Sequence, residues 1–160
     1  MENAILKLIE NDAKISASQI ALALGIDENE VREIIHGLEE SGIIAGYKTL
    51  IDWDKAGRED VTALIEIKVI PQLGQGFERI AKRLSQYSEV ESVYLMSGGF
   101  DVAVMVTGSS LREVACFVSD KIAPLEYVTA TATHFVLHKF KDKGIVYSDG
   151  VEKQERICAF

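Results

Sequence analysis

Five consecutive residues in the second half of the chain could bind a small zwitterion: Ser97, Gly98, Gly99, Phe100 and Asp101. Paired glycines leave backbone N–H groups open to a carboxylate, and an aspartate can accept a charge-assisted hydrogen bond from an ammonium group. The same residues suit a plain hairpin turn, because glycine supplies positive φ angles. Both interpretations predict a turn between two paired strands.

Other reactive side chains do not form a recognisable centre. His134 and His138 are separated by about 13 Å if the segment is an extended strand, which is too far for one metal ion. Cys116 is expected to be a small buried hydrophobe, and Cys158 forms no CxxC pair with it. No nucleophile–base pair, phosphate loop or carboxylate pair stands out. We therefore expect no enzyme, no metal site and no cofactor.

A split pair of βαβ units must position the turn. Residues 61–69 alternate apolar and polar side chains, which predicts a half-buried strand that stops at Pro71. The later predicted elements are a helix with a face of Phe77, Ile80, Ala81 and Leu84, strands 90–96 and 100–107, a helix capped by Ser110 and Glu113 with a face of Leu111, Val114, Ala115 and Val118, and a closing strand 128–140. This order predicts an α+β domain with both helices on one face of an antiparallel sheet.

Both faces of that sheet carry apolar side chains. Tyr94, Met96, Ala103 and Met105 point away from the face of their strand neighbours, and that opposite face is also apolar. A solvated face would be more polar. We therefore expect a second subunit to cover this face, which makes the protein at least a dimer.

Three helices are predicted in the first 45 residues. Ser16 and Gln19 form a capping box for a helix that stops at Gly25. Asp27 and Glu30 cap the next helix, which ends at Gly42. These two helices and the short connection between them resemble a helix-turn-helix, in which the second helix projects into a groove of DNA. A plain three-helix core is the alternative. A short strand or wing over 43–51 and a polar linker over 52–60 are expected to follow.

Charge and hydropathy limit the partners of this 160-residue chain. It has 25 acidic and 17 basic residues and a formal net charge of −8, and seven of the eight excess negative charges fall within residues 1–60. This balance argues against nucleic acid, because phosphate binding depends on Lys and Arg. The chain has no apolar run long enough for a bilayer and no basic, apolar leader, so we expect a soluble cytoplasmic protein without a membrane partner.

Three stretches of the chain resemble the Lrp/AsnC, or feast/famine, family of transcriptional regulators. They are the helix-turn-helix with the run Leu38–Tyr47, the turn Ser97–Asp101 and the ending Thr131–Leu137. The pattern Leu-Glu-x-x-Gly-x-Ile-x-Gly-Tyr in the first stretch is fairly specific. The resemblance implies a winged helix-turn-helix over 1–50, a linker over 51–60, a ferredoxin-like RAM (ACT-like) domain over 61–141 and a tail over 142–160.

The resemblance also implies partners. Family members bind double-stranded DNA, form dimers that assemble further into octamers or related rings, and commonly bind an amino acid between subunits. The implied effector contacts are the five turn residues together with Thr131 or Thr133 of the last strand. The implied DNA contacts fall into two groups: Asn29, Arg32 and His36 would contact base edges, and Ser16 and Ser18 would contact phosphates. Lys48, on the predicted wing, is a further candidate for contact with DNA.

The helix that should read DNA departs from the expected charge. Off its core face it carries four acids against one arginine and a histidine. Asp27 and Glu30 suit the helix N-terminus, but Glu28 and Glu33 have less reason to be there. Two functions therefore stay open. The chain is a DNA-binding regulator of amino-acid or related metabolism with an amino-acid effector, or an effector-sensing or heteromeric partner whose acidic head has lost autonomous DNA binding.

Overall fold

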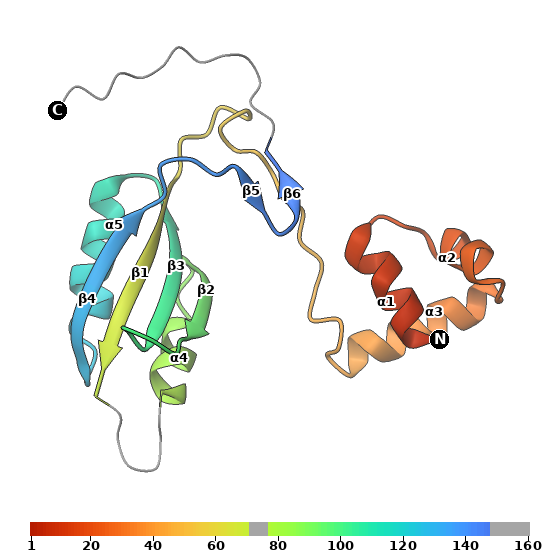
Figure 1. Cartoon of the computed structure of the whole chain (residues 1–160), viewed down its shortest axis with the longest axis horizontal. Coiled ribbons are helices and arrows are strands. Elements are labelled where there is room, and N and C mark those ends of the chain that lie inside the picture. The colour runs from red at the N-terminus through yellow and green to blue at the C-terminus, as the bar shows by residue number, and fades with distance from the viewer. Residues whose placement is uncertain (71–76, 148–160) are drawn as a thin grey trace. The chain divides into compact units, whose positions relative to one another are not determined.

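The computed structural model describes residues 1–70 and 77–147 of the chain. The chain divides into two compact units, Met1–Ile51 and Asp52–Phe160, which are shown in Figure 1. The predictions made for Pro71, Cys158 and most of the tail lie outside the described residues. No helix in the described parts is long and apolar enough to cross a membrane.

The first unit contains three helices around one small core. They are α1 (Glu2–Asn11), α2 (Ala17–Leu24) and α3 (Glu28–Glu40). Ile5, Ile20, Ala21 and Val31 form one buried cluster, and Leu38 of α3 is also buried. Each helix therefore contributes its apolar stripe, while the polar side chains stay at the surface.

Local capping sets the limits of α2, as predicted. The Ser16 hydroxyl accepts a hydrogen bond from the Gln19 N–H at 3.2 Å, and the Ser16 N–H donates to the Gln19 side chain at 2.9 Å. Gly25 then adopts φ 68° and ends the helix. This left-handed conformation favours glycine, because a Cβ atom would clash with the backbone.

The residue that pairs with the N-cap of α3 differs from the prediction. Asp27 caps the helix, but its carboxylate accepts from the Asn29 N–H at 2.8 Å, so Glu30 is the wrong partner. A short aspartate side chain reaches the second helical N–H readily, and this satisfies one of the open donors without a reciprocal bond. Gly42, with φ 73°, follows the helix end at Ser41.

The strand predicted over 43–51 is absent from the structure. No strand occurs between residues 41 and 60, all of which are described. Instead, the Tyr47 hydroxyl donates a hydrogen bond to Glu39 Oε1 at 2.9 Å and ties the chain back to α3. A strand needs a hydrogen-bonded neighbour, and the described part of this unit offers no second strand.

The second unit is a four-stranded antiparallel sheet in the order β2-β3-β1-β4. Its elements follow the predicted βαββαβ order: β1 (Val61–Val69), α4 (Glu78–Leu84), β2 (Val90–Leu95), β3 (Val102–Gly108), α5 (Leu111–Phe117) with a π-helical turn η1 (Val118–Ile122), and β4 (Val128–Phe135). The predicted ferredoxin-like α+β fold is confirmed.

The last described segment, residues 135–147, differs from the prediction. The last strand of the sheet ends at Phe135 rather than residue 140. Residues 142–146, expected at the start of a tail, lie in a hairpin formed by β5 (Lys141–Asp142) and β6 (Ile145–Val146). Gly144 at φ 85° helps the hairpin reverse direction.

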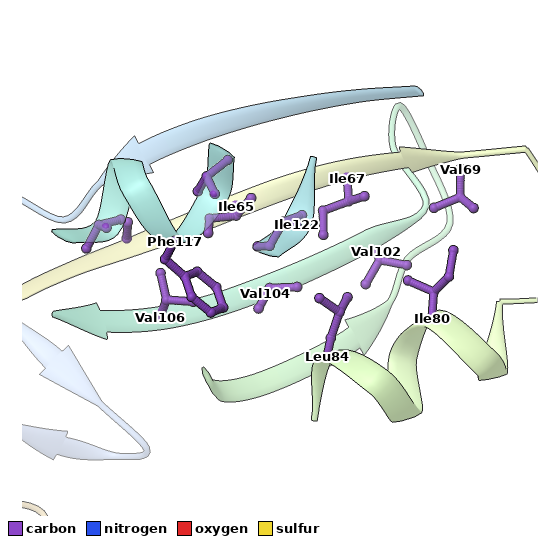
Figure 2. Close-up of a cluster of buried hydrophobic side chains, with 13 residues drawn as sticks. Ile65, Ile67, Val69, Ile80, Leu84, Val102, Val104, Val106, Phe117 and Ile122 are labelled. Carbon is purple, nitrogen blue, oxygen red and sulfur yellow. The ribbon is translucent and has the colours of Figure 1, made fainter. Parts of the chain in front are cut away.

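The core of this unit lies between the sheet and the helices. Figure 2 shows Ile65, Val104, Leu84 and Phe117, from two strands and both helices, pointing into one buried cluster. The predicted buried face of α4 is confirmed, with Ile80 and Leu84 buried, whereas the predicted face of α5 is confirmed only in part.

The face of α5 is rotated relative to the prediction. Val114 and Val118 are buried as expected, but Leu111 is 57% exposed and Ala115 is also exposed. Phe117 enters the core instead, and the following residues continue as a π-helical turn. Cys116, expected to be buried, is exposed, because it follows the buried Val114 by two residues, or about 200°, and so lies on the opposite side of the helix.

Candidate effector turn and DNA-binding helices

Asp101 ties the β2–β3 turn to the end of β1. The Met96 N–H donates to the Asp101 carbonyl oxygen at 2.8 Å and closes the turn. The Asp101 N–H donates to the Ile67 carbonyl at 3.0 Å, and Asp101 Oδ2 accepts from the Val69 N–H at 2.8 Å. One carboxylate oxygen of Asp101 therefore has a structural role that sequence reasoning missed, since only the tertiary register brings β1 to it.

The backbone of the turn is open on its outer side. Gly98 and Gly99 are exposed, and a Cβ atom placed on either one would meet no atom within 4 Å. Asp101 Oδ1 has no hydrogen-bond donor among the described residues. The turn thus offers two peptide units and one uncommitted carboxylate oxygen, a combination that suits an α-carboxylate and an α-ammonium group.

The two threonines predicted as effector contacts do not lie at the turn of the same chain. Thr131 pairs with Ile67 and Thr133 with Ile65, so β1 separates both of them from β3. Neighbouring strands are about 4.8 Å apart, which places Thr131 roughly 10 Å from the start of β3. Thr133 is two residues further from the turn along β4.

The face of the sheet opposite the helices presents two aligned rows of side chains. Tyr94, Ala103, Glu66 and Ala132 form one row, and Ser92, Met105, Leu64 and His134 form the next. The predicted alternation is therefore confirmed for Tyr94, Ala103 and Met105, whereas Met96, the fourth predicted residue, lies after the end of β2 at Leu95. Tyr94 is 53% exposed, and His134 Nε2 lies 3.3 Å from Glu66 Oε1.

On α3, two of the predicted DNA contacts have acidic partners on their own helix. The Arg32 guanidinium binds the Glu28 carboxylate one turn earlier, and His36 Nε2 lies 3.4 Å from Glu40 Oε1. Asn29 is exposed and has no side-chain partner among the described residues. Glu28 is thus explained as the partner of Arg32, whereas Glu33 has no such contact in the described structure.

The predicted phosphate contacts lie at the surface. Ser16 and Ser18 start α2, with their hydroxyl oxygens 2.9 Å apart, and both residues are exposed. The positive end of the helix dipole lies at this point. Lys48 is exposed in the segment after α3. These three residues are available to DNA, although Ser16 also holds the helix cap.

The ion pair between Lys121 and Glu89, outside the turn, was not predicted from the sequence. Lys121 Nζ lies 2.5 Å from Glu89 Oε1 and 5.4 Å from the ring centroids of Tyr87 and Phe117. The hydrogen bond from Lys121 lowers the pKa of Glu89 below its ordinary value. No group of three His, Cys, Asp or Glu side chains in residues 1–70 and 77–147 could hold a metal ion.

Comparisons with known sequences match both units. Residues 2–45 match the winged helix-turn-helix DNA-binding family, and residues 62–146 match the Lrp/AsnC ligand binding domain. The chain is 45% identical to YugG, an uncharacterized HTH-type transcriptional regulator of Bacillus subtilis (strain 168). The alignment covers 93% of this chain and 90% of YugG. The chain is 29% identical over 88% of its length to 96% of the HTH-type transcriptional regulator LrpA of Pyrococcus horikoshii.

Solved structures share the fold. Escherichia coli AsnC has a TM-score of 0.67 at 19% identity, covering 90% of this chain and 95% of its own. The regulator NMB0573 of Neisseria meningitidis, solved as an L-Met complex, has a TM-score of 0.70 at 18% identity, covering 88% and 90%. The two matched domain families and the 45% identity to YugG show that the chain belongs to the Lrp/AsnC family of DNA-binding transcriptional regulators.

Proposed function

We propose that this regulator binds an amino acid at the Ser97–Asp101 turn and controls genes of amino-acid or related metabolism. The observation that carries the proposal is that only one of the two carboxylate oxygens of Asp101 is hydrogen-bonded within the described structure. Asp101 Oδ2 accepts from the Val69 N–H, while Asp101 Oδ1 has no donor among the described residues and the exposed Gly98 and Gly99 have open space where a Cβ atom would lie. The L-Met complex of the Neisseria relative supports an amino acid as the ligand class.

The same geometry links the proposed effector site to the end of β1, through the hydrogen bond between Asp101 and the Val69 N–H. An ammonium group bound to Asp101 would draw charge from the oxygen that holds the end of β1. The effector then changes the stability of the contact between the turn and Val69. A ligand shifts an equilibrium only through such a difference in contacts, so this bond is the element through which we propose that binding is transmitted.

Thr131 and Thr133 enter this proposal through a second copy of the chain. Within one chain, β1 lies between these threonines and the turn. We therefore assign the two threonines to the site of a neighbouring subunit, in an assembly of at least two copies. A subunit-spanning site makes effector binding and assembly depend on each other.

For DNA, we propose that Asn29, Arg32 and His36 contact base edges and that Ser16, Ser18 and Lys48 contact phosphates. Arg32 must leave Glu28 to do so, and His36 must leave Glu40. These two acidic partners are the observation that favours the alternative, an effector-sensing or heteromeric module without autonomous DNA binding. Direct DNA-binding measurements separate the two functions.

The effector site is tested by thermal unfolding with each standard amino acid. At least one amino acid is expected to raise the Tm of the unchanged protein. Asp101→Asn keeps an oxygen for the Val69 N–H, so its ligand-free Tm should stay near the original while the ligand-induced shift disappears. Asp101→Ala should also lower the ligand-free Tm, because it leaves that N–H without its acceptor.

A matched control is Asp120→Asn, which neutralises an exposed aspartate of the same unit. This variant should keep the full ligand-induced shift. Equal shifts in the unchanged protein and in Asp101→Asn would show that the Asp101 charge does not anchor the ligand. Failure of every standard amino acid to stabilise the unchanged protein would contradict an amino-acid effector altogether.

A further inference from the structure

Helix α4 has an unusual charge for this protein. It contains three bases, Arg79, Lys82 and Arg83, and one acid, Glu78. None of the other described helices has more bases than acids, and α3 carries five acids against one arginine. The sequence of residues 71–76 contains no charged side chain, so it adds nothing to this balance. The second unit therefore has a positive helix, whereas the DNA-reading helix of the first unit is negative.

The three bases lie on one face of α4. Ile80 and Leu84 point from α4 into the core, as Figure 2 shows. Successive helical residues are about 100° apart, so Arg79, Lys82 and Arg83 fall within an arc of about 100° on the side away from the core. All three are exposed, and the Lys82 side chain is 80% exposed.

The fold itself explains only part of this charge. Lys82 and Arg83 lie in the last turn, where the helix dipole favours cations. Arg79 lies in the first turn, where the dipole disfavours it, and it repels Arg83 four residues later. Among the described residues neither arginine forms an ion pair, and the 4.0 Å contact of Lys82 with Glu78 is too exposed to contribute much.

The DNA-binding unit lacks the positive charge that phosphate binding needs. Residues 1–51 contain four bases and nine acids, and one of the bases, Arg32, is paired with Glu28. Sequence-independent affinity for DNA comes mainly from lysines and arginines that replace counterions at phosphates. An acidic head can select a sequence through base edges, but it gains little affinity from its charge.

We propose that α4 is a second DNA-binding surface, on which Arg79, Lys82 and Arg83 contact backbone phosphates of the DNA held by the helix-turn-helix. On this account the head selects the sequence and α4 supplies electrostatic affinity. The proposal rests on DNA binding by the family's helix-turn-helix and is independent of the effector. The acidic α3 of a second copy is the competing occupant of the same face.

The test compares the salt dependence of DNA binding for the full chain and two triple variants. The probe is a fluorescent duplex of the protein's own upstream region, titrated by anisotropy at several KCl concentrations. Arg79→Gln/Lys82→Gln/Arg83→Gln removes the α4 charges. Arg112→Gln/Lys141→Gln/Lys143→Gln removes the same number of charges from exposed sites elsewhere in the second unit.

Each phosphate that the α4 variant no longer binds should make the slope of log K against log salt shallower by about 0.9, and three such phosphates by about 2.7. The control variant should retain most of the original slope. Light scattering without DNA should give the same molar mass for all three proteins.

Two results would overturn the proposal while DNA binding itself stands. Equal slopes for the unchanged protein and the α4 variant would show that α4 does not touch phosphates, and an equal change of slope in both variants would show an effect of net charge alone. A smaller molar mass of the α4 variant with an unchanged slope would assign this face to α3 of a second copy. No DNA binding by the unchanged protein would instead contradict the helix-turn-helix function on which the proposal rests.

Discussion

At the scale of single residues, Asp101 connects three parts of the second unit. Its main chain pairs with Met96 and Ile67, and its carboxylate holds the N–H of Val69. The sequence has an aspartate beside a predicted glycine turn, and this pattern predicts that the Asp101 carboxylate can pair with an ammonium group. It does not predict the bond to Val69, because that residue is 32 positions away in the chain and is placed by the sheet register.

Two glutamates of the second unit have altered ionisation for clear local reasons. The hydrogen bond from Lys121 lowers the pKa of Glu89 from 4.5. Hydrogen bonds from the side chain and backbone of Ser109, both at 2.6 Å, lower the pKa of Glu113. A carboxyl group with a lower pKa in the folded state stabilises that state above its unfolded pKa and loses this contribution as pH falls through the folded pKa.

We therefore expect the urea midpoint of unfolding to decrease as the pH is lowered from about 5 to about 3. Lys121→Gln removes the main cause of the shift at Glu89, so the decrease should become smaller. Lys143→Gln, a change at an exposed lysine of the hairpin, should leave the pH profile as it is. Identical profiles for the unchanged protein and Lys121→Gln would show that the Lys121–Glu89 pair does not contribute to stability in solution.

At the scale of elements, local signals predicted some boundaries and not others. Ser16, Gln19 and Gly25 determine α2 through bonds and dihedral angles within a few residues, and the sequence shows all of them. The strand expected over 43–51 depends on a neighbouring strand, which local composition cannot reveal. Cys116 is exposed because it lies about 200° around α5 from the buried Val114, and the sequence did not show which apolar residues of this helix form the buried face.

The cap of α2 is tested by replacing each of its two serines. Ser16→Ala should lower the free energy of unfolding by about 1 kcal/mol, because the Gln19 N–H loses its acceptor. Ser18→Ala keeps that bond and should change stability much less. If both serines contact phosphate, each variant should also weaken DNA binding. Urea unfolding and anisotropy measure the two effects separately, and equal stabilities for the two variants would contradict the assigned cap.

At the scale of the whole molecule, the sheet face opposite the helices is the surface that we expect to join subunits. Its rows combine Leu64, Met105 and Tyr94 with the Glu66–His134 contact. The alternation along the strands predicted this face from the sequence. Which residues align across the four strands follows only from the register, including the irregularities in β1 and β2.

Met105→Glu would place a charge between Leu64 and Ser92 in the middle of this face. An unpaired buried charge is costly, so the variant should be monomeric at micromolar concentration while the unchanged protein is at least a dimer. Leu111→Glu alters an exposed leucine on α5 and should keep the original molar mass. Light scattering decides the question, and a monomeric unchanged protein would contradict the proposed assembly.

The regulator function depends on selective DNA binding by a chain whose α3 is acidic. Its most direct test is anisotropy with a duplex of the protein's own upstream region and a scrambled duplex of equal length, at several salt concentrations. We predict tighter binding to the upstream duplex at every salt concentration, with both affinities falling as salt rises. Equal affinity for the two duplexes, or no binding even at the lowest salt, would contradict the claim and favour a sensor without DNA-binding activity of its own.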